Sequence, residues 1–384
     1  MKFLFLLENY NWFYSNAFEK DQSDNSLSYA EHLIKLLSHT YYQSDGLGNA
    51  LSGVGHQAEY IIPHCYPLQL NWLKEHDKKT FLKYQVTRPL RSFESRVLGR
   101  TNPLQRIAEE ICCKQVELEK PDILYLFSGV WLGKEALERM KKCCGKMILQ
   151  WSCPIANDWK KFPFSLFDLI LSSAPSLIRS FSSKGIRTAF LQQAFDERLS
   201  PSEQVVRSRA VFAGNFHPAH HKKRIKLIDL LLAEDAIDVL CPNPGNDPVF
   251  KQISSSRMEA VEGIRLSEAF ASYKIALHYP GDDFMEDAGA KRLFEITGSG
   301  AMLLAFAQPG IEKYFVAGKE IVLFTGEADC LEKIRYYLSH EEERASIAAA
   351  GKKRTSTEHT FRNRATELLK LLQTEVQYPK ICVE

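Results

Sequence analysis

Short apolar runs alternate along this chain with longer stretches in which apolar residues recur at helical spacing. Nearly every residue within a run is apolar, which is typical of strands buried on both faces of a parallel sheet. The alternation of strand and helix occurs in both halves of the chain, so we predict two doubly wound α/β domains. The predicted strands are residues 3–7, 58–62, 123–127, 147–151, 169–171 and 188–191 in the first half, and 210–213, 237–240, 275–278, 302–305 and 320–324 in the second.

A short polar stretch that contains a proline, Ser200-Pro201-Ser202-Glu203, separates the two halves. It predicts an N-terminal domain of residues 1–202 and a C-terminal domain that begins at residue 203. A last helical stretch, Arg364–Leu372, follows the final predicted strand and could pack on either domain.

Composition narrows the class of protein. The chain has 384 residues and a formal net charge of +2, with 45% hydrophobic and 25% charged residues. These values exclude a disordered chain, a fibrous protein and a strongly basic protein around which nucleic acid wraps. No apolar run approaches the ~18 residues that a membrane helix needs. The run at residues 3–7 ends at Glu8, too early for a secretory signal, so we expect it to be a buried strand.

Cysteine usage favours a reducing compartment. The nine cysteines are an odd number, two pairs are adjacent in sequence (Cys112–Cys113 and Cys143–Cys144), and none forms a Cys-x-x-Cys pair. Neighbouring cysteines rarely bridge each other, and we therefore expect free thiols and a cytoplasmic protein.

The segment 286–300 carries the strongest signal for a binding site. A helix that begins at about Ala288 would place Gly289 at its N-terminus, where free backbone N–H groups and the helix dipole favour a phosphate. Lys291 and Arg292 would add cationic donors close by.

Two carboxylates of the same segment, Asp287 and Glu295, would then lie about two turns apart on one helix face. That spacing would let one of them contact a sugar and the other a ribose about 10 Å along the helix axis. The alternative is an ordinary amphipathic helix with a solvated charged face.

A second candidate segment follows the predicted strand 210–213. The strand ends at Gly214, and a glycine lets a ligand approach the backbone closely. Asn215 comes next, and a basic run that includes Arg224 then begins a helix. For the exposed lysines of that run, Lys222 and Lys223, a solvated face is the alternative.

The run Arg292-Leu293-Phe294-Glu295-Ile296-Thr297-Gly298-Ser299-Gly300-Ala301-Met302-Leu303-Leu304 resembles the signature of the group 1 glycosyltransferases. It most resembles their CgeB-like (spore-maturation) branch. The resemblance continues in the same order through residues 310–324, 334–351 and 359–364, whereas the N-terminal half is only broadly similar.

The resemblance implies a GT-B fold, in which two Rossmann-like domains face each other across a cleft. It implies transfer of a sugar, with retention of configuration, from a nucleotide-diphosphate donor: a UDP-sugar first, with a GDP-sugar as the alternative. No metal cofactor is implied, and no Asp-x-Asp or histidine cluster with the spacing of metal ligands stands out, with Asp282-Asp283 as the possible exception. The resemblance also implies a C-terminal domain of residues 203–360 and a last helix, within residues 361–384, that returns to the N-terminal domain.

The family pattern assigns roles to single residues. Glu295 matches the second glutamate of the E-x7-E pattern, which holds the ribose hydroxyls of the donor. The first position holds Asp287 in place of glutamate, and Glu286 could substitute if the register is shifted. The implied catalytic residues are Asp287, Arg292 and Glu295, and the implied donor-binding residues are Gly214, Asn215, Arg224, Cys241, Gly289, Lys291, Glu295 and Ile296.

The N-terminal domain is expected to hold the acceptor. An aromatic and amide-rich loop follows the first predicted strand, and its composition suits a sugar, although a core cluster explains the aromatic residues equally well. The candidates are Asn9, Tyr10, Trp12, Trp151 and Ser152. A basic stretch from Arg88 to Arg106 could bind a phosphate-bearing acceptor, or its side chains could lie on the solvated face of a helix.

Other readings stay open at this point. The acceptor could be a glycan, a lipid-linked sugar, a small molecule or a nucleic acid, and the sequence does not give the oligomeric state. Asp287 keeps open a non-catalytic nucleotide- or sugar-binding protein with the same fold. Nucleotide-sugar epimerisation and phosphorolysis are further chemistries of this fold.

Overall fold

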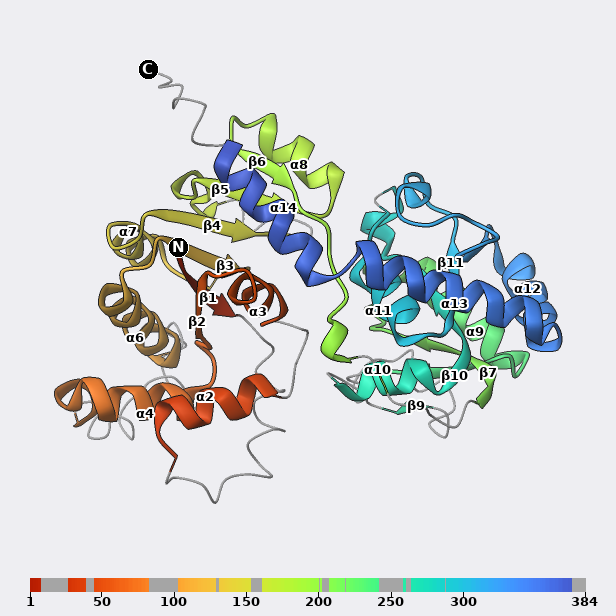
Figure 1. The fold of residues 1–384 in the computed structure, drawn as a ribbon, viewed down its shortest axis with the longest axis horizontal. Helices are drawn as coiled ribbons and strands as arrows, with labels where there is room; N and C mark the ends of the chain where they lie inside the picture. Colours follow the sequence, from red (N-terminus) through yellow and green to blue (C-terminus); the bar gives the residue numbers. More distant parts are fainter. Residues whose placement is uncertain are drawn as a thin grey trace. The chain divides into compact units, whose positions relative to one another are not determined.

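The computed structural model describes residues 1–7, 27–38, 45–82, 103–128, 131–152, 161–199, 201, 207–217, 219–241, 258–259, 264–286 and 288–374. The chain divides into two compact units (Figure 1). The first comprises Met1–His39, Gly48–Ser172 and Ser180–Ala189, and the second comprises Thr40–Leu47, Ser173–Arg179 and Phe190–Glu384.

The first unit is built on a six-stranded sheet with the order β2-β1-β3-β4-β5-β6. Strand β1, second in this order, pairs in parallel with both β2 and β3. Phe5 of β1 lies level with Tyr60 and Tyr125 on its two neighbours, and the three rings pack at centroid distances of 5.6 and 5.1 Å. The strands are β1 (Lys2–Leu7), β2 (Gln57–Ile61), β3 (Ile123–Phe127), β4 (Lys146–Gln150), β5 (Leu169–Ser172) and β6 (Thr188–Phe190).

The second unit has its own six-stranded sheet, with the order β12-β11-β10-β7-β8-β9 and parallel pairing throughout. Successive residues of β10 enter different cores: Ile275 and Leu277 pack on one face of the sheet, and Ala276 packs on the other. Both faces are therefore buried. The strands are β7 (Arg207–Ala213), β8 (Ile237–Leu240), β9 (Met258–Glu259), β10 (Tyr273–His278), β11 (Met302–Phe306) and β12 (Val322–Phe324).

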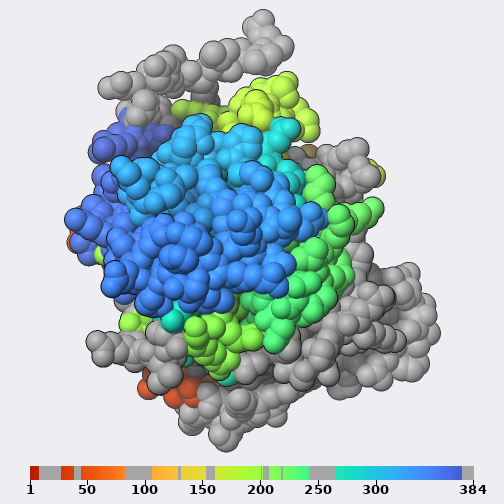
Figure 2. Space-filling model, turned by 90° about the vertical axis from the view of Figure 1, so that its right-hand side faces the viewer, coloured from red at the N-terminus to blue at the C-terminus, as the bar shows by residue number. Residues whose placement is uncertain are grey.

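Helices connect the strands in both units and cover the sheets (Figure 1). In the second unit Arg335, on one surface helix, pairs with Glu234 at the end of another, and Figure 2 shows these green and blue parts of the chain adjoining on one face. The helices are α2 (Tyr29–Ser38), α3 (Gly46–Ser52), α4 (Tyr66–His76), α6 (Pro103–Glu119), α7 (Lys134–Lys141), α8 (Pro175–Ser182), α9 (Lys222–Ala233), α10 (Ile264–Ala271), α11 (Lys291–Ser299), α12 (Glu327–Ser339), α13 (Glu341–Glu358) and α14 (Phe361–Thr374).

The prediction of two parallel-sheet α/β domains is confirmed, since every predicted strand coincides with an observed one. The two-residue strand β9 was missed because so short an element leaves no run of apolar residues to detect. Among the described helices, none is both long enough and apolar enough to cross a membrane. The domain limits at residues 202 and 360, and the return of the last helix to the N-terminal domain, stay predictions.

Gly351 provides a test of the packing in the second unit. It lies in α13, and a Cβ on it would overlap the carbonyl oxygen of Glu320. Alanine favours a helix over glycine by about 1 kcal/mol, but here its methyl group must push α13 away from the chain that leads into β12. We expect Gly351→Ala to lower the free energy of unfolding by about 1–3 kcal/mol, the usual cost of overpacking.

Thermal denaturation followed by circular dichroism checks this expectation. Gly326→Ala is the matched control, because Gly326 has an extended backbone and nothing within 4 Å of the position of a Cβ. Equal melting temperatures for Gly351→Ala and Gly326→Ala would contradict the packing described.

Candidate functional site

The carboxyl ends of two neighbouring strands in the second sheet, β7 and β10, bring together the residues of the candidate site. Strand β7 continues into Gly214 and Asn215, and β10 ends at His278 and continues into Tyr279. The strands are parallel and paired, so these residues lie at the same edge of the sheet. Ligands of open α/β sheets bind at this edge.

Helix α11 begins near this edge at Lys291, three residues later than predicted. The physical reason is Gly289, whose φ of +109° lies outside the range of a right-handed helix. The capping position, Ala290, offers no side-chain hydrogen bond to the first turn, and its carbonyl accepts the N–H of Leu293 at 3.0 Å. The helix therefore carries Glu295 but not residue 287, and Asp287 itself lies outside the described residues.

Glu295 forms ion pairs with two cations of the preceding turn. Its Oε1 lies 3.3 Å from Nζ of Lys291, and its Oε2 lies 2.8 Å from Nη1 of Arg292. All three side chains are largely buried, with 13%, 22% and 23% of Glu295, Lys291 and Arg292 exposed. Burial alone would raise the pKa of Glu295, but Arg292 and Lys291 outweigh it and hold the pKa below its usual value. Glu295 is therefore an anion that fixes both cations in place.

Arg224 joins the loops that follow β7 and β10. Its Nη1 donates to the carbonyl of Asn215 at 2.8 Å, and its Nε and Nη2 donate to the carbonyl of Tyr279 at 3.2 and 2.9 Å. Its guanidinium also lies over the ring of Phe212, 5.5 Å from the centroid. Burial, and then the nearby charge of Arg292, lower the pKa of Arg224 to about 10. The two guanidinium groups therefore lie close enough to repel each other.

His278 lies beside these arginines at the end of β10. Its side chain is buried, and its Nε2 has no hydrogen-bond partner. Burial, and then the charges of Arg224 and Arg292, lower its pKa to about 3. The imidazole is therefore neutral near pH 7, and the positive charge of the site resides on the arginine and lysine side chains.

The N-terminus of α9 is occupied by a carboxylate from the loop after β10. Asp282 accepts from the backbone N–H of Lys222 at 2.8 Å and of Lys223 at 3.4 Å. The side chains of these two lysines are exposed, as expected for a solvated face. The adjacent Asp283 pairs with His220 at 2.6 Å. In the described part of the chain, no three His, Cys, Asp or Glu side chains are grouped so as to hold a metal ion.

The site thus combines three cations, Arg224, Lys291 and Arg292, with the carboxylate of Glu295, which pairs with two of them, while Asp282 and Asp196 act electrostatically on Arg224 and Lys291. Partly buried cations beside the positive end of a helix dipole suit an anion with more than one negative charge. The arrangement can bind such an anion and stabilise negative charge that develops on it.

Three predicted residues have buried side chains. Ile296 and Cys241 pack in the two cores of the second unit, so only their backbone groups are placed to contact a ligand. In the first unit the ring of Trp151 is 2% exposed and packs edge-on against Phe164, so it cannot stack on a sugar.

The remaining predicted residues differ in packing and exposure, and some of them lie outside the described part of the chain. Gly214 is required by packing, since a Cβ there would lie 2.9 Å from the ring of Phe212. Asn215 is exposed and Ser152 is partly exposed. Asn9, Tyr10 and Trp12 lie outside the described residues, as does the basic stretch up to Arg100, whereas Arg106 is exposed.

Sequence reasoning missed residues that support the site from the loops after β6 and β11. Asp196 is buried, pairs with Arg198 and acts electrostatically on Lys291. Gln308 donates to the carbonyl of Phe284 at 2.8 Å and so holds the loop after β10. Both follow a strand by a few residues, but nothing else in the local sequence marks them as part of a site.

Comparisons with known proteins give a match to one family model and several solved structures of similar fold. Residues 225–370 match a protein-family model described as glycosyl transferase-like. A search of curated proteins gave no match. Three similar solved structures are distant in sequence but alike in fold.

Sucrose-phosphate synthase from Thermosynechococcus elongatus is 10% identical, with a TM-score of 0.58 over 98% of this chain and 99% of its own. HepE of Anabaena, in complex with UDP and glucose, is 12% identical, with a TM-score of 0.54 over 97% of this chain and 100% of its own. The pneumococcal O-GlcNAc transferase GtfA, in complex with UDP and GlcNAc, is 12% identical, with a TM-score of 0.50 over 72% of this chain and 61% of its own. These likenesses confirm the GT-B fold, and the CgeB-like branch stays a prediction.

The buried His278 predicts how the stability of the fold depends on pH. An unfolded histidine titrates near pH 6.5, whereas the pKa of the folded His278 is about 3. Between these values the unfolded chain binds more protons, so the free energy of unfolding falls as the pH falls. Each pH unit below 6.5 should cost up to about 1.4 kcal/mol for such a histidine.

His278→Gln should therefore lose less stability than the wild type between pH 6.5 and 4.5, as measured by urea denaturation. Burial likewise lowers the pKa of His359 to about 4. The dependence of the free energy of unfolding on pH should therefore become weaker in His278→Gln but should not vanish. An unchanged dependence of the free energy of unfolding on pH would contradict the burial of an uncharged His278.

Proposed function

We propose that this protein is a glycosyltransferase that binds a nucleotide-diphosphate sugar at the carboxyl edge of the second sheet. The observation that carries the proposal is the group of three cations around the start of α11, two of which, Lys291 and Arg292, lie within the residues that match the glycosyl transferase-like family model. A diphosphate supplies the negative charge that this group lacks.

The same cations account for catalysis. Negative charge builds up on the diphosphate as the bond to the sugar breaks. Fixed hydrogen-bond donors therefore stabilise the transition state more than they stabilise the bound nucleotide-sugar. Arg224 uses three of its N–H groups on backbone carbonyls, which leaves two of its five for a phosphate oxygen. Arg292 is oriented by Glu295 and lies over the ring of Phe270 at 5.3 Å.

We propose that transfer proceeds with retention of configuration and without a metal ion. The acceptor hydroxyl would attack the face of the sugar that the diphosphate leaves, and the departing phosphate oxygen would take the hydroxyl proton. Arg224, Lys291 and Arg292 would supply the charge that a metal ion supplies in other transferases. This pathway needs no protein nucleophile.

The donor is proposed to be a UDP-sugar, with a GDP-sugar as the alternative. UDP is named in the solved structures of HepE and GtfA, both of which share the fold. Glu295 is proposed to accept hydrogen bonds from the ribose hydroxyls, since a carboxylate with two ion pairs keeps lone pairs for further donors.

The acceptor is proposed to bind to the N-terminal domain, near Ser152 and the predicted residues Asn9, Tyr10 and Trp12. Its chemical class, whether glycan, lipid-linked sugar, small molecule or nucleic acid, is for experiment to decide. A cytoplasmic location is proposed because the described cysteines are free thiols.

Arg292→Gln tests the proposal directly. The substitution removes a positive charge and a charged hydrogen bond to the diphosphate, roughly 1.5–3 kcal/mol. We expect affinity for UDP, measured by isothermal titration calorimetry, to fall about ten- to a hundredfold. Release of UDP from a UDP-sugar should slow by at least as much, because the contact strengthens in the transition state.

The matched control is Arg335→Gln, which removes an exposed arginine of the same unit that pairs with Glu234. It should leave affinity and turnover unchanged. If Arg292→Gln kept wild-type affinity and turnover, the diphosphate would not be bound where we propose.

A further inference from the structure

Gln192 lies two residues beyond the end of β6 and belongs to the second unit. Its side chain is 4% exposed. Its Oε1 accepts the backbone N–H of Gln193 at 2.6 Å, which fixes the orientation of the carboxamide. Its Nε2 is buried and has no hydrogen-bond partner. A buried donor without an acceptor costs about 1–3 kcal/mol, so this amide calls for an explanation.

The backbone before α11 is shaped around this amide. A Cβ on Gly289 would overlap Nε2 of Gln192 and would lie 3.1 Å from the hydroxyl of Tyr314. Gly289 also has a φ of +109°, which residues with a side chain rarely adopt. Both the lack of space for a Cβ and the positive φ therefore require glycine at this position. As a result, the Gln192 amide lies directly against the start of α11.

Hydrogen-bond donors of the Gln192 amide lie beside the start of α11. The two N–H groups of the amide have no acceptor, and the capping residue of the helix, Ala290, offers no side-chain hydrogen bond. Lys291, the first residue of the helix, pairs with Glu295 at 3.3 Å. Amide donors without an acceptor at the positive end of a helix dipole are complementary to an oxygen-rich anion.

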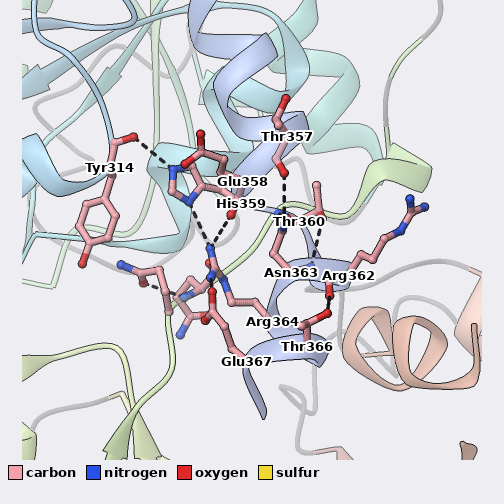
Figure 3. Close-up of polar contacts among 12 residues, drawn as sticks. Tyr314, Thr357, Glu358, His359, Thr360, Arg362, Asn363, Arg364, Thr366 and Glu367 are labelled. Carbon is pink, nitrogen blue, oxygen red and sulfur yellow. Dashed lines mark hydrogen bonds and ion pairs between the residues drawn. The ribbon is translucent and has the colours of Figure 1, made fainter. Parts of the chain in front are cut away.

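The segment that carries Gln192 is held firmly in place by the break between α13 and α14 (Figure 3). Phe195 pairs with this break through backbone hydrogen bonds to His359 at 2.8 Å and from Phe361 at 3.3 Å. Arg364 donates from Nε to the carbonyl of Gln193 at 3.2 Å, and its Nη2 contacts the carbonyl of Glu358 and Nδ1 of His359, both at 3.1 Å. The Gln192 amide is thus preordered, so little entropy is lost when it binds a ligand.

We infer that Gln192 is a binding residue for the terminal phosphate of the donor, the one bonded to the sugar. This inference rests on the proposed function and adds to it a residue that the family pattern does not include. Glu295, proposed to hold the ribose, lies four residues after Lys291, the first residue of α11, which is about 6 Å along the helix axis. The Gln192 amide lies against Gly289, before the helix begins, so it lies on the side of the far phosphate, whereas the near phosphate lies closer to the ribose.

The test compares UDP with UMP by isothermal titration calorimetry on the full chain, with GDP and GMP as the pair if the wild type prefers guanine. Gln192→Met keeps the size of the side chain and removes its donors. We expect it to lower affinity for the diphosphate five- to thirtyfold and to leave affinity for the monophosphate within twofold. Gln192→Glu, which places a negative charge at the same point, should lower diphosphate affinity more than fiftyfold.

The matched control is Gln69→Met, at another buried glutamine, in the first unit, where Nε2 donates to the carbonyl of Ile62. It should leave both affinities unchanged. Wild-type diphosphate affinity in Gln192→Met, or an equal loss for mono- and diphosphate, would overturn the inference and leave the proposed function standing. A wild type that binds neither UDP nor GDP would overturn both.

Discussion

The burial of three cations, Arg224, Lys291 and Arg292, is the constraint on which the candidate site depends. Buried like charges destabilise a fold unless something compensates them. The protein uses backbone carbonyls for Arg224 and the carboxylate of Glu295 for both Lys291 and Arg292. A folded protein that holds such a group of cations at one edge of a sheet is suited to bind an anionic ligand.

The fold explains why these groups meet although they are far apart in sequence. Parallel pairing of β7 and β10 brings Asn215 and Tyr279 to one edge of the sheet, and the two carbonyls are then joined by one guanidinium. The start of α11 is set by Gly289, which turns the chain by a left-handed residue. The site is therefore defined by backbone geometry, and its side chains are held by partners that leave them little freedom. Such preorganisation is what stabilisation of a leaving group requires.

The strands and the chemistry of α11 could be predicted from the sequence, because apolar runs and charged residues at helical spacing reflect local preferences. The start of α11 could not, since helical periodicity does not show that Gly289 adopts a positive φ. Trp151 and Ile296 were assigned to ligands because they follow a strand or belong to a motif, yet each fills a core. Burial of a single side chain depends on contacts between distant segments, which no local pattern records.

Gln192 is the opposite case, a residue of the proposed site that the local sequence does not indicate. Its neighbours, Gly289 and the break between α13 and α14, are distant from it in sequence, so nothing in the local run of residues marks it as a candidate. The importance of Asp196 was missed for the same reason. Long-range pairing of the segment after β6 with residues 359–361 creates both environments.

The central claim is that the cations at the carboxyl edge of the second sheet bind the diphosphate of a nucleotide-sugar donor. A crystal structure of the protein grown with saturating UDP tests it most directly. We predict density for the diphosphate within hydrogen-bond distance of Arg224, Arg292 and the first N–H groups of α11. A nucleotide bound elsewhere on the chain, or crystals without nucleotide at a concentration that saturates related transferases, would contradict the claim.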